Sequence, residues 1–272
     1  MLHFLKYKNS SIAFHVFGQG SNTLFCMHGY GDNGNSFSFL EKFLGNDYHI
    51  IAPDLPMHGD TQWNGNKIFE PSDILDWIPR MQEIAGVQLT EKNKIHLLGY
   101  SMGGRLALSI FNKAPNNFEK IFLLCPDGLH ENFWHYVSTQ TWAGNMLFKK
   151  TMHRPGWFFH LMDVAHSIKL LNKSVVKFAH HYLDDPKARA LLYKRWTLFR
   201  KFLPSTSRVK KNIIQHKTPL TLVFGNYDRI ILSKRSDTIK KSNPYVKVFI
   251  LDAGHQILRE KYGPEIARVF YQ

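Results

Sequence analysis

The stretch that decides the fold is Gly99-Tyr100-Ser101-Met102-Gly103, which follows an apolar run at Lys94–Leu98 and precedes a predicted helix at Met102–Lys113. The pattern G-x-S-x-G between a strand and a helix is typical of a sharp turn that presents a serine hydroxyl at the edge of a parallel sheet. Glycines at the flanking positions let backbone crowd where a Cβ would clash. The stretch therefore predicts Ser101 as a nucleophile on a strand–turn–helix unit.

Apolar runs like the one before Gly99 recur along the chain. Short continuous apolar runs that alternate with helical segments predict buried parallel strands with helices between them. The first two predicted strands, Leu2–Tyr7 and Ser11–Phe17, instead alternate apolar and polar residues, which is typical of a hairpin. We expect strands at Leu2–Tyr7, Ser11–Phe17, Thr23–Met27, Tyr48–Ala52, Lys94–Leu98, Lys120–Cys125, Pro219–Phe224 and Val246–Leu251. The sequence thus predicts an α/β fold with an eight-stranded, mostly parallel sheet.

Residues 128–216 differ from the rest, because they contain aromatic and helical stretches but no clear strand. No low-complexity tract or flexible linker marks either junction. We therefore expect a helical cap at 128–216, inserted between strands six and seven of one core domain made of residues 1–127 and 217–272. Its aromatic residues, Trp134 and Trp157 among them, are candidates for lining a substrate pocket or, alternatively, for attaching the cap to the core.

A serine hydroxyl is a weak nucleophile at neutral pH, so a base and an orienting acid are expected. Gly254-His255 follows the last predicted strand, and Asp228 follows the strand before it. The order Ser, Asp, His along the chain is the one that accompanies this serine turn. His255 would accept the serine proton, while Asp228 would hold the imidazole tautomer and stabilise the imidazolium.

Two other carboxylates compete with Asp228 as the acid. Asp127, in Cys125-Pro126-Asp127-Gly128, also follows a predicted strand, and it stays open as an alternative. Asp252 lies nearer to His255 in the sequence, but its position between strand and histidine suits a turn better.

The developing oxyanion needs two hydrogen-bond donors. One candidate is the backbone N–H of Met102, directly after the serine. The other is the backbone N–H of Tyr30, in His28-Gly29-Tyr30-Gly31, because a second donor comes from the loop after an early strand. We expect His28 to be a buried residue that braces this loop.

These segments together resemble the α/β-hydrolase superfamily, in its order and over nearly the whole chain outside the cap. The matching stretches are His28-Gly29-Tyr30-Gly31, Asp54-Leu55-Pro56-Met57-His58-Gly59, Gly99–Gly104, Phe224–Asp228 and Gly254-His255. The resemblance implies the α/β-hydrolase fold and a serine nucleophile. It also implies that the stretch containing His58 is a structural loop without a chemical role.

The superfamily hosts many reactions, so the fold does not decide among them. The simplest expectation is a serine hydrolase, carboxylesterase-like, that cleaves a carboxylic ester or thioester of a small to medium substrate through an acyl-enzyme on Ser101. Tyr100, directly before the serine, and Arg105, one helical turn after it, are candidate substrate contacts.

Two alternatives to a hydrolase remain. The run Gly99–Leu108 also resembles the pyruvate-eliminating synthase of menaquinone biosynthesis, a lyase in which the triad serves as a base and arginines bind carboxylates. Arg105 would be the matching arginine, although a local salt bridge would equally explain it. The weaker alternative is a non-catalytic binding module, which would typically lack a triad member; all three candidates are present here.

The chain is strongly basic, with 35 Lys and Arg against 21 Asp and Glu, a net charge of +14. Residues 128–216 hold 15 of the former and 4 of the latter, so the remaining 20 and 17 leave the core nearly neutral. This location favours steering of an anionic substrate or contact with an anionic membrane surface over nucleic-acid binding, for which no motif is present. Coding bias toward lysine is the alternative explanation.

No cofactor or metal is expected, because neither zinc-type cysteine spacing nor a phosphate-binding loop occurs. No apolar run reaches the ~18 residues of a membrane span, which argues against an integral membrane protein. Cys26 and Cys125 each lie in an apolar run, as reduced core cysteines of a cytoplasmic protein would. The oligomeric state is left open.

Overall fold

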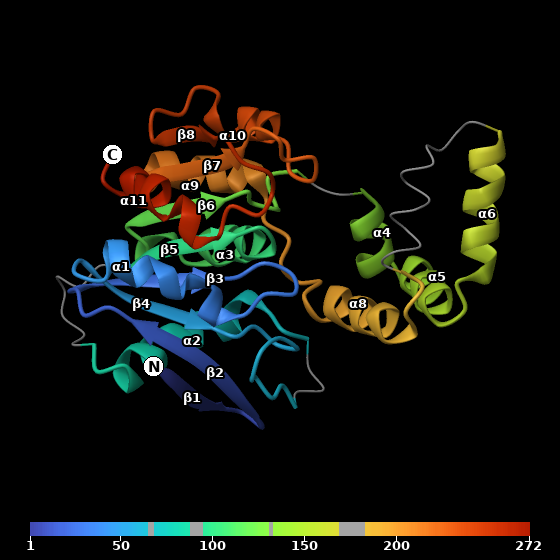
Figure 1. Cartoon of the computed structure of the whole chain (residues 1–272), viewed down its shortest axis with the longest axis horizontal. Coiled ribbons are helices and arrows are strands. Elements are labelled where there is room, and N and C mark those ends of the chain that lie inside the picture. Colours follow the sequence, from blue (N-terminus) through green and yellow to red (C-terminus); the bar gives the residue numbers. More distant parts are fainter. Residues whose placement is uncertain (65–67, 88–94, 131–132, 169–182) are drawn as a thin grey trace. The chain divides into compact units, whose positions relative to one another are not determined.

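A computed structural model describes residues 1–64, 68–87, 95–130, 133–168 and 183–272 (Figure 1). Within these ranges, eight strands form one sheet in the order β1-β2-β4-β3-β5-β6-β7-β8. Strand β2 pairs antiparallel with β1 and with β4, and the other neighbouring strands are parallel. The predicted eight-stranded, mostly parallel sheet is confirmed.

Each predicted strand is present, with ends that differ by at most two residues. The strands are β1 (Leu2–Tyr7), β2 (Ser10–Phe17), β3 (Asn22–Met27), β4 (Tyr48–Pro53), β5 (Ile95–Tyr100), β6 (Lys120–Leu124), β7 (Leu220–Gly225) and β8 (Val246–Leu251). The described α-helices are α1 (Glu41–Leu44), α2 (Pro71–Ile84), α3 (Met102–Lys113), α4 (Phe133–Gln140), α5 (Trp142–His153), α6 (Gly156–Ser167), α8 (Pro186–Leu198), α9 (Thr206–His216), α10 (Asp237–Lys240) and α11 (Gly263–Phe270). Short 3₁₀ helices are η1 (Gly34–Leu40), η2 (Pro115–Asn117), η3 (Ser233–Ser236) and η4 (Glu260–Tyr262).

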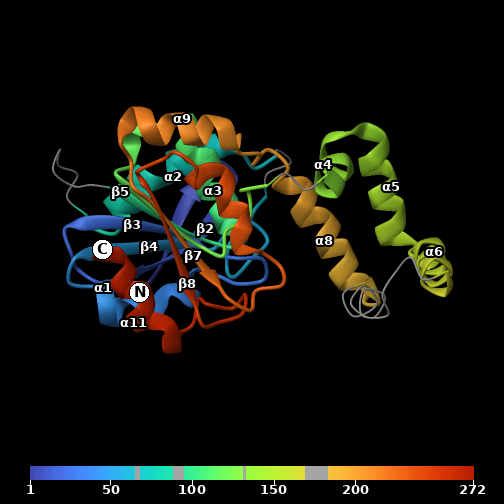
Figure 2. The ribbon, with the colours of Figure 1, turned by 90° about the horizontal axis from the view of Figure 1, so that it is seen from above.

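Helices cover both faces of the sheet, which explains why its central strands are continuous apolar runs. Helices α2, α3 and α9 pack on one face, and α1 and α11 on the other (Figure 2). Every residue of β7 is buried, whereas the edge strand β1 alternates between exposed and buried positions. No helix in the described ranges combines the length and apolar composition that crossing a bilayer requires.

The chain divides into two compact units, one made of Met1–His130 and Phe202–Gln272 and the other of Glu131–Lys201. The second unit is shorter than the predicted cap at 128–216. Helix α9 belongs to the first unit, where it packs with α3 and buries Val209 and Ile213 completely. The assignment of the second unit as a cap stays a prediction.

The second unit has a small core of its own, in which α5 contacts α4, α6 and α8. Two of its cations, Arg189 and Arg195, are buried there. Arg189 Nε donates to the carbonyl of Met152 near the end of α5, at 2.9 Å. Part of the positive charge of this segment therefore serves its internal packing.

Candidate active site

Ser101 occupies the turn between β5 and α3, at the carboxyl end of the parallel strands. Its backbone has φ 50° and ψ −115°, a left-handed conformation that is strained for a residue with a Cβ. Neighbouring backbone holds it there: Ser101 N–H donates to the Leu124 carbonyl at 2.9 Å, and the Ser101 carbonyl accepts from Asp127 N–H at 2.9 Å. The turn is thus fixed by β6 and by the segment that follows it.

The first turn of α3 approaches the end of β3 so closely that only glycine fits at position 103. A Cβ on Gly103 would lie 1.9 Å from the Met27 carbonyl oxygen, a distance that real Cβ atoms do not adopt. This contact brings the loop that begins at His28 against the start of α3. It is the physical reason for the second glycine of the G-x-S-x-G pattern.

His255 extends from the loop after β8 to the serine. Its Nε2 lies 3.0 Å from Ser101 Oγ, within hydrogen-bond distance. The Tyr100 hydroxyl donates to the His255 carbonyl at 3.2 Å, which fixes the loop to the end of β5. The same loop passes close to the end of β7, since a Cβ on Gly225 would lie 2.2 Å from the Gly254 carbonyl oxygen.

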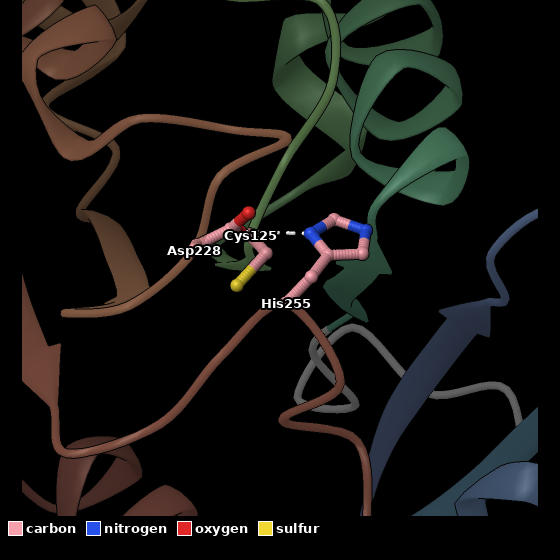
Figure 3. A group of neighbouring side chains, drawn as sticks. All are labelled: Cys125, Asp228 and His255. Carbon is pink, nitrogen blue, oxygen red and sulfur yellow. Dashed lines mark hydrogen bonds and ion pairs between the residues drawn. The ribbon is translucent and has the colours of Figure 1, made fainter. Parts of the chain in front are cut away.

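Asp228 contacts the other ring nitrogen of His255. Its Oδ2 lies 2.8 Å from His255 Nδ1 (Figure 3), and its Oδ1 accepts the N–H groups of Ile230 and Ile231 at 2.8 and 2.9 Å. The side chain is fully buried. Burial opposes ionisation of the carboxyl, but the hydrogen bonds from Ile231, His255 and Ile230 outweigh it and lower the pKa of Asp228.

The competing carboxylates lie elsewhere. Asp127 Oδ2 is 3.6 Å from Arg105 Nε, and its Oδ1 accepts the N–H of Gly128 at 2.8 Å. Asp252 is exposed to solvent. Of the three acids weighed from the sequence, Asp228 is the one that the structure brings to His255.

The two predicted oxyanion donors lie on segments that meet at the serine turn. Met102 is the first residue of α3, where a backbone N–H has no partner within the helix. The loop that carries Tyr30 is braced by His28, which is completely buried and accepts the N–H of Leu55 at Nε2, at 3.0 Å. His58 is also buried, and its Nδ1 lies 3.0 Å from the Pro56 carbonyl oxygen.

The candidate substrate contacts have different surroundings. Tyr100 is buried beside His255, and the side chain of Arg105, one turn into α3, is only 10% exposed and lies beside Asp127. Trp134 and Trp157 belong to α4 and α6 of the second unit, and both are exposed. Substrate binding by these four residues stays a prediction.

Cys125 is a neighbour of the site, whereas its sequence context predicts only a core cysteine. Its Sγ, a carboxylate oxygen of Asp228 and a ring nitrogen of His255 all lie within 4.8 Å of one another, and these residue types can hold a metal such as zinc (Figure 3). The sequence could have indicated this proximity, because Cys125 directly follows β6 and Asp228 follows β7, the neighbouring strand of the sheet.

Known proteins similar to this chain share its fold. The model of the family described as the alpha/beta hydrolase fold matches residues 22–262. The chain is 25% identical over 256 residues to the uncharacterized hydrolase YugF of Bacillus subtilis, covering 93% of this chain and 89% of that protein. It is 25% identical over 240 residues to lipase 1 of Psychrobacter immobilis, covering 85% and 70%. A thermophilic esterase from Thermogutta terrifontis has a similar structure, with a TM-score of 0.67 at 15% identity over 100% of this chain and 97% of that one.

Proposed function

The chain is a hydrolase that belongs to the α/β-hydrolase family, and we propose that it cleaves a carboxylic ester or thioester through an acyl-enzyme on Ser101. One observation carries the proposal: the hydrogen-bond chain from Ser101 Oγ to His255 Nε2, at 3.0 Å, and from His255 Nδ1 to Asp228 Oδ2, at 2.8 Å. With these separations, a neutral serine can lose its proton as it attacks.

In the proposed acylation step, Ser101 Oγ attacks the substrate carbonyl while its proton passes to His255 Nε2. The imidazolium formed there faces the Asp228 carboxylate, whose low pKa keeps it ionised. The N–H groups of Met102 and Tyr30 donate to the oxygen of the tetrahedral intermediate. His255 Nε2–H then protonates the leaving alkoxide or thiolate, and the acyl group stays on the serine.

Deacylation uses the same groups in reverse. His255 Nε2 takes a proton from water as that water attacks the acyl carbonyl. The second tetrahedral intermediate collapses when Nε2–H returns the proton to Ser101 Oγ, which releases the carboxylic acid. No other group on the protein has to gain or lose a proton in either half of the cycle.

The ester and thioester class is supported by the relative named as a lipase. The lyase alternative has no comparable support, because the two relatives described above are named as a hydrolase and a lipase. Arg105, which that alternative would use to bind a substrate carboxylate, lies beside Asp127.

The test is a panel of p-nitrophenyl esters with acyl chains from acetyl to lauroyl, together with acyl-thioester substrates. We expect turnover of at least part of the panel by the wild-type chain and none above background by Ser101→Ala of unchanged fold. Failure of the wild type on every ester and thioester, or equal rates for the two proteins, would overturn the proposal.

A further inference from the structure

Helix α6 of the second unit (Figure 1) carries a row of apolar side chains that are exposed to solvent. Trp157, Leu161, Val164 and the residue directly after the helix, Ile168, are 41, 55, 43 and 61% exposed. At 100° per residue, their spacing along the chain places them within about 60° of one another around the helix axis. We call this row the α6 stripe. Met162, on the other side of the helix, is buried, and α6 packs against α5.

The stripe is part of a wider imbalance between the interior and the surface of the second unit. Within residues 133–168 and 183–201, the large apolar side chains that are buried are Met152, Met162 and Phe199. Polar side chains occupy part of the interior as well, His135 and Thr139 among them. The exposed apolar side chains are those of the α6 stripe together with Phe133, Trp134, Tyr136, Trp142, Met146, Leu147 and Leu191. An apolar surface of this extent on a small unit is typical of a face that binds another surface.

The same unit carries more than half of the positive charge of the chain. Residues 131–201 hold 12 Lys and Arg and 4 Asp and Glu, a net charge of +8, whereas the rest of the chain has a net charge of +6. Lys149 and Lys150 in the last turn of α5 and Arg154 directly after it are exposed. These cations precede α6 in the sequence, and α6 itself has one exposed acid, Asp163. The apolar stripe and a cationic cluster thus belong to neighbouring, packed helices.

Charge and composition together indicate which kind of surface fits this face. A second copy would bring two units of +8 together, and the rest of the chain is also positive, so neither offers the opposite charge. A nucleic acid is anionic, but its phosphates offer no apolar layer to Leu161, Val164 and Ile168. A bilayer with anionic lipids combines negative headgroups with an apolar interior, and tryptophan beside lysine is typical of residues at that boundary.

The length of α6 limits how it can meet a bilayer. Its 12 residues span about 18 Å, which is less than the ~30 Å thickness of a hydrocarbon core. The helix is therefore too short to cross a bilayer, but it can lie in the interface with its apolar stripe toward the acyl chains. The cations at the end of α5 can then reach the headgroups.

We propose that the second unit binds the surface of a bilayer that contains anionic lipids. The α6 stripe enters the boundary of the acyl chains, while Lys149, Lys150 and Arg154 bind the headgroups. Trp157, which the sequence analysis names as a candidate substrate contact, contacts lipid in this arrangement. The inference goes beyond the chemistry at Ser101, because binding to lipid needs no nucleophile.

Co-sedimentation of the full chain with vesicles tests the proposal. Ser101→Ala serves as the reference protein, so that no lipid is hydrolysed during the measurement. Vesicles of phosphatidylcholine alone are compared with vesicles of phosphatidylcholine and phosphatidylserine in equal parts. We expect the affinity for the mixed vesicles to be higher by at least about tenfold and to fall as the salt concentration rises.

The contribution of the stripe is measured by adding Leu161→Ser and Ile168→Ser to the reference protein. We expect this change to lower the affinity for the mixed vesicles by about tenfold, because two apolar side chains no longer leave water. The matched control is Phe4→Ser with Ile250→Ser, since these side chains are 53 and 50% exposed on the edge strands β1 and β8. The control should bind like the reference, and thermal melting verifies the fold of both variants.

The contribution of the cations is measured by Lys149→Gln with Lys150→Gln. Because each lysine near an anionic surface contributes independently, the affinity at low salt should fall by about thirtyfold. The matched control is the exposed adjacent pair at the end of α10, Lys240→Gln with Lys241→Gln, which removes the same charge from the first unit. The control should change the affinity by less than about twofold, since these lysines lie outside the proposed contact.

Three results would overturn the proposal: no binding by the reference protein, equal binding to the two kinds of vesicle, or unchanged binding by the stripe variant. Light scattering without lipid adds a fourth. A dimer that dissociates on Leu161→Ser with Ile168→Ser would show that a second copy covers the stripe. Hydrolysis of soluble esters by the wild type is a separate measurement, so its absence together with vesicle binding would refute the proposed function alone.

Discussion

Replacing Asp228 by asparagine changes the charge of the proposed acid while keeping its shape. The two backbone N–H groups of Ile230 and Ile231 point at Oδ1, at 2.8 and 2.9 Å. An amide NH₂ cannot accept hydrogen bonds, so the carboxamide oxygen of the variant must take the Oδ1 position. The NH₂ group then takes the Oδ2 position, 2.8 Å from His255 Nδ1.

The consequence is an exchange of tautomers on the histidine. Because the NH₂ group donates to Nδ1, this nitrogen must accept, and the neutral imidazole carries its proton on Nε2. That nitrogen faces Ser101 Oγ at 3.0 Å and can no longer take the serine proton. The corresponding change in a serine protease triad lowers kcat by about 10⁴, and we expect a loss on the order of 10³ to 10⁴ here.

The assay is kcat on the best p-nitrophenyl ester near neutral pH, with circular dichroism to verify the fold. Asp127→Asn is the matched control, since Asp127 also follows a strand but lies beside Arg105. It should stay within about threefold of the wild type, as expected when a partly exposed ion pair is lost. The reasoning is refuted if folded Asp228→Asn keeps more than a tenth of the wild-type kcat, or if Asp127→Asn loses as much.

Three stability measurements probe the contacts around the site. Gly103→Ala should lower the free energy of unfolding by about 3 kcal/mol, because the new Cβ would lie 1.9 Å from the Met27 carbonyl oxygen; Gly156→Ala, which meets nothing within 4 Å, should change it by less than about 0.5 kcal/mol. Ser101→Gly should have a free energy of unfolding about 1 kcal/mol higher than Ser101→Ala, because glycine relaxes the strain of φ 50°. Equal stabilities of the two variants would contradict a strained turn. Because the pKa of Asp228 is lowered on folding, its charge stabilises the fold above the unfolded pKa of about 3.9, and this advantage is lost as the pH falls through the folded value. In urea denaturation, the stability difference between wild type and Asp228→Asn should therefore shrink below about pH 4, and a constant difference would count against the contact.

Much of the fold was predictable because its signal is local. The strand Leu220–Gly225 is buried at every position, so its sequence is a continuous apolar run that needs no neighbour to be recognised. The carboxyl ends of parallel strands meet at one edge of a sheet. Residues that follow separate strands, such as Ser101, Asp228 and His255, could therefore be expected near one another from their order along the chain.

Other features depend on contacts that a single sequence does not specify. Asp127 and Asp228 both follow strands, and the direction of each side chain is set by the backbone after that strand. Helix α9 has apolar residues at helical spacing, Val209 and Ile213, but this pattern is the same whichever unit the helix packs against. The neighbourhood of Cys125 depends on the register of β6 with β7 and on a left-handed φ in a residue type that rarely adopts it.

The central claim is that Ser101 is a nucleophile activated by His255, and a fluorophosphonate probe tests it most directly. Intact-mass and peptide mass spectrometry would measure how much phosphonyl adduct forms and on which residue. We predict one equivalent per chain, located on Ser101, with slow labelling in His255→Ala and none in Ser101→Ala. Absence of the adduct in the wild type, or equal labelling of Ser101→Ala, would contradict the claim.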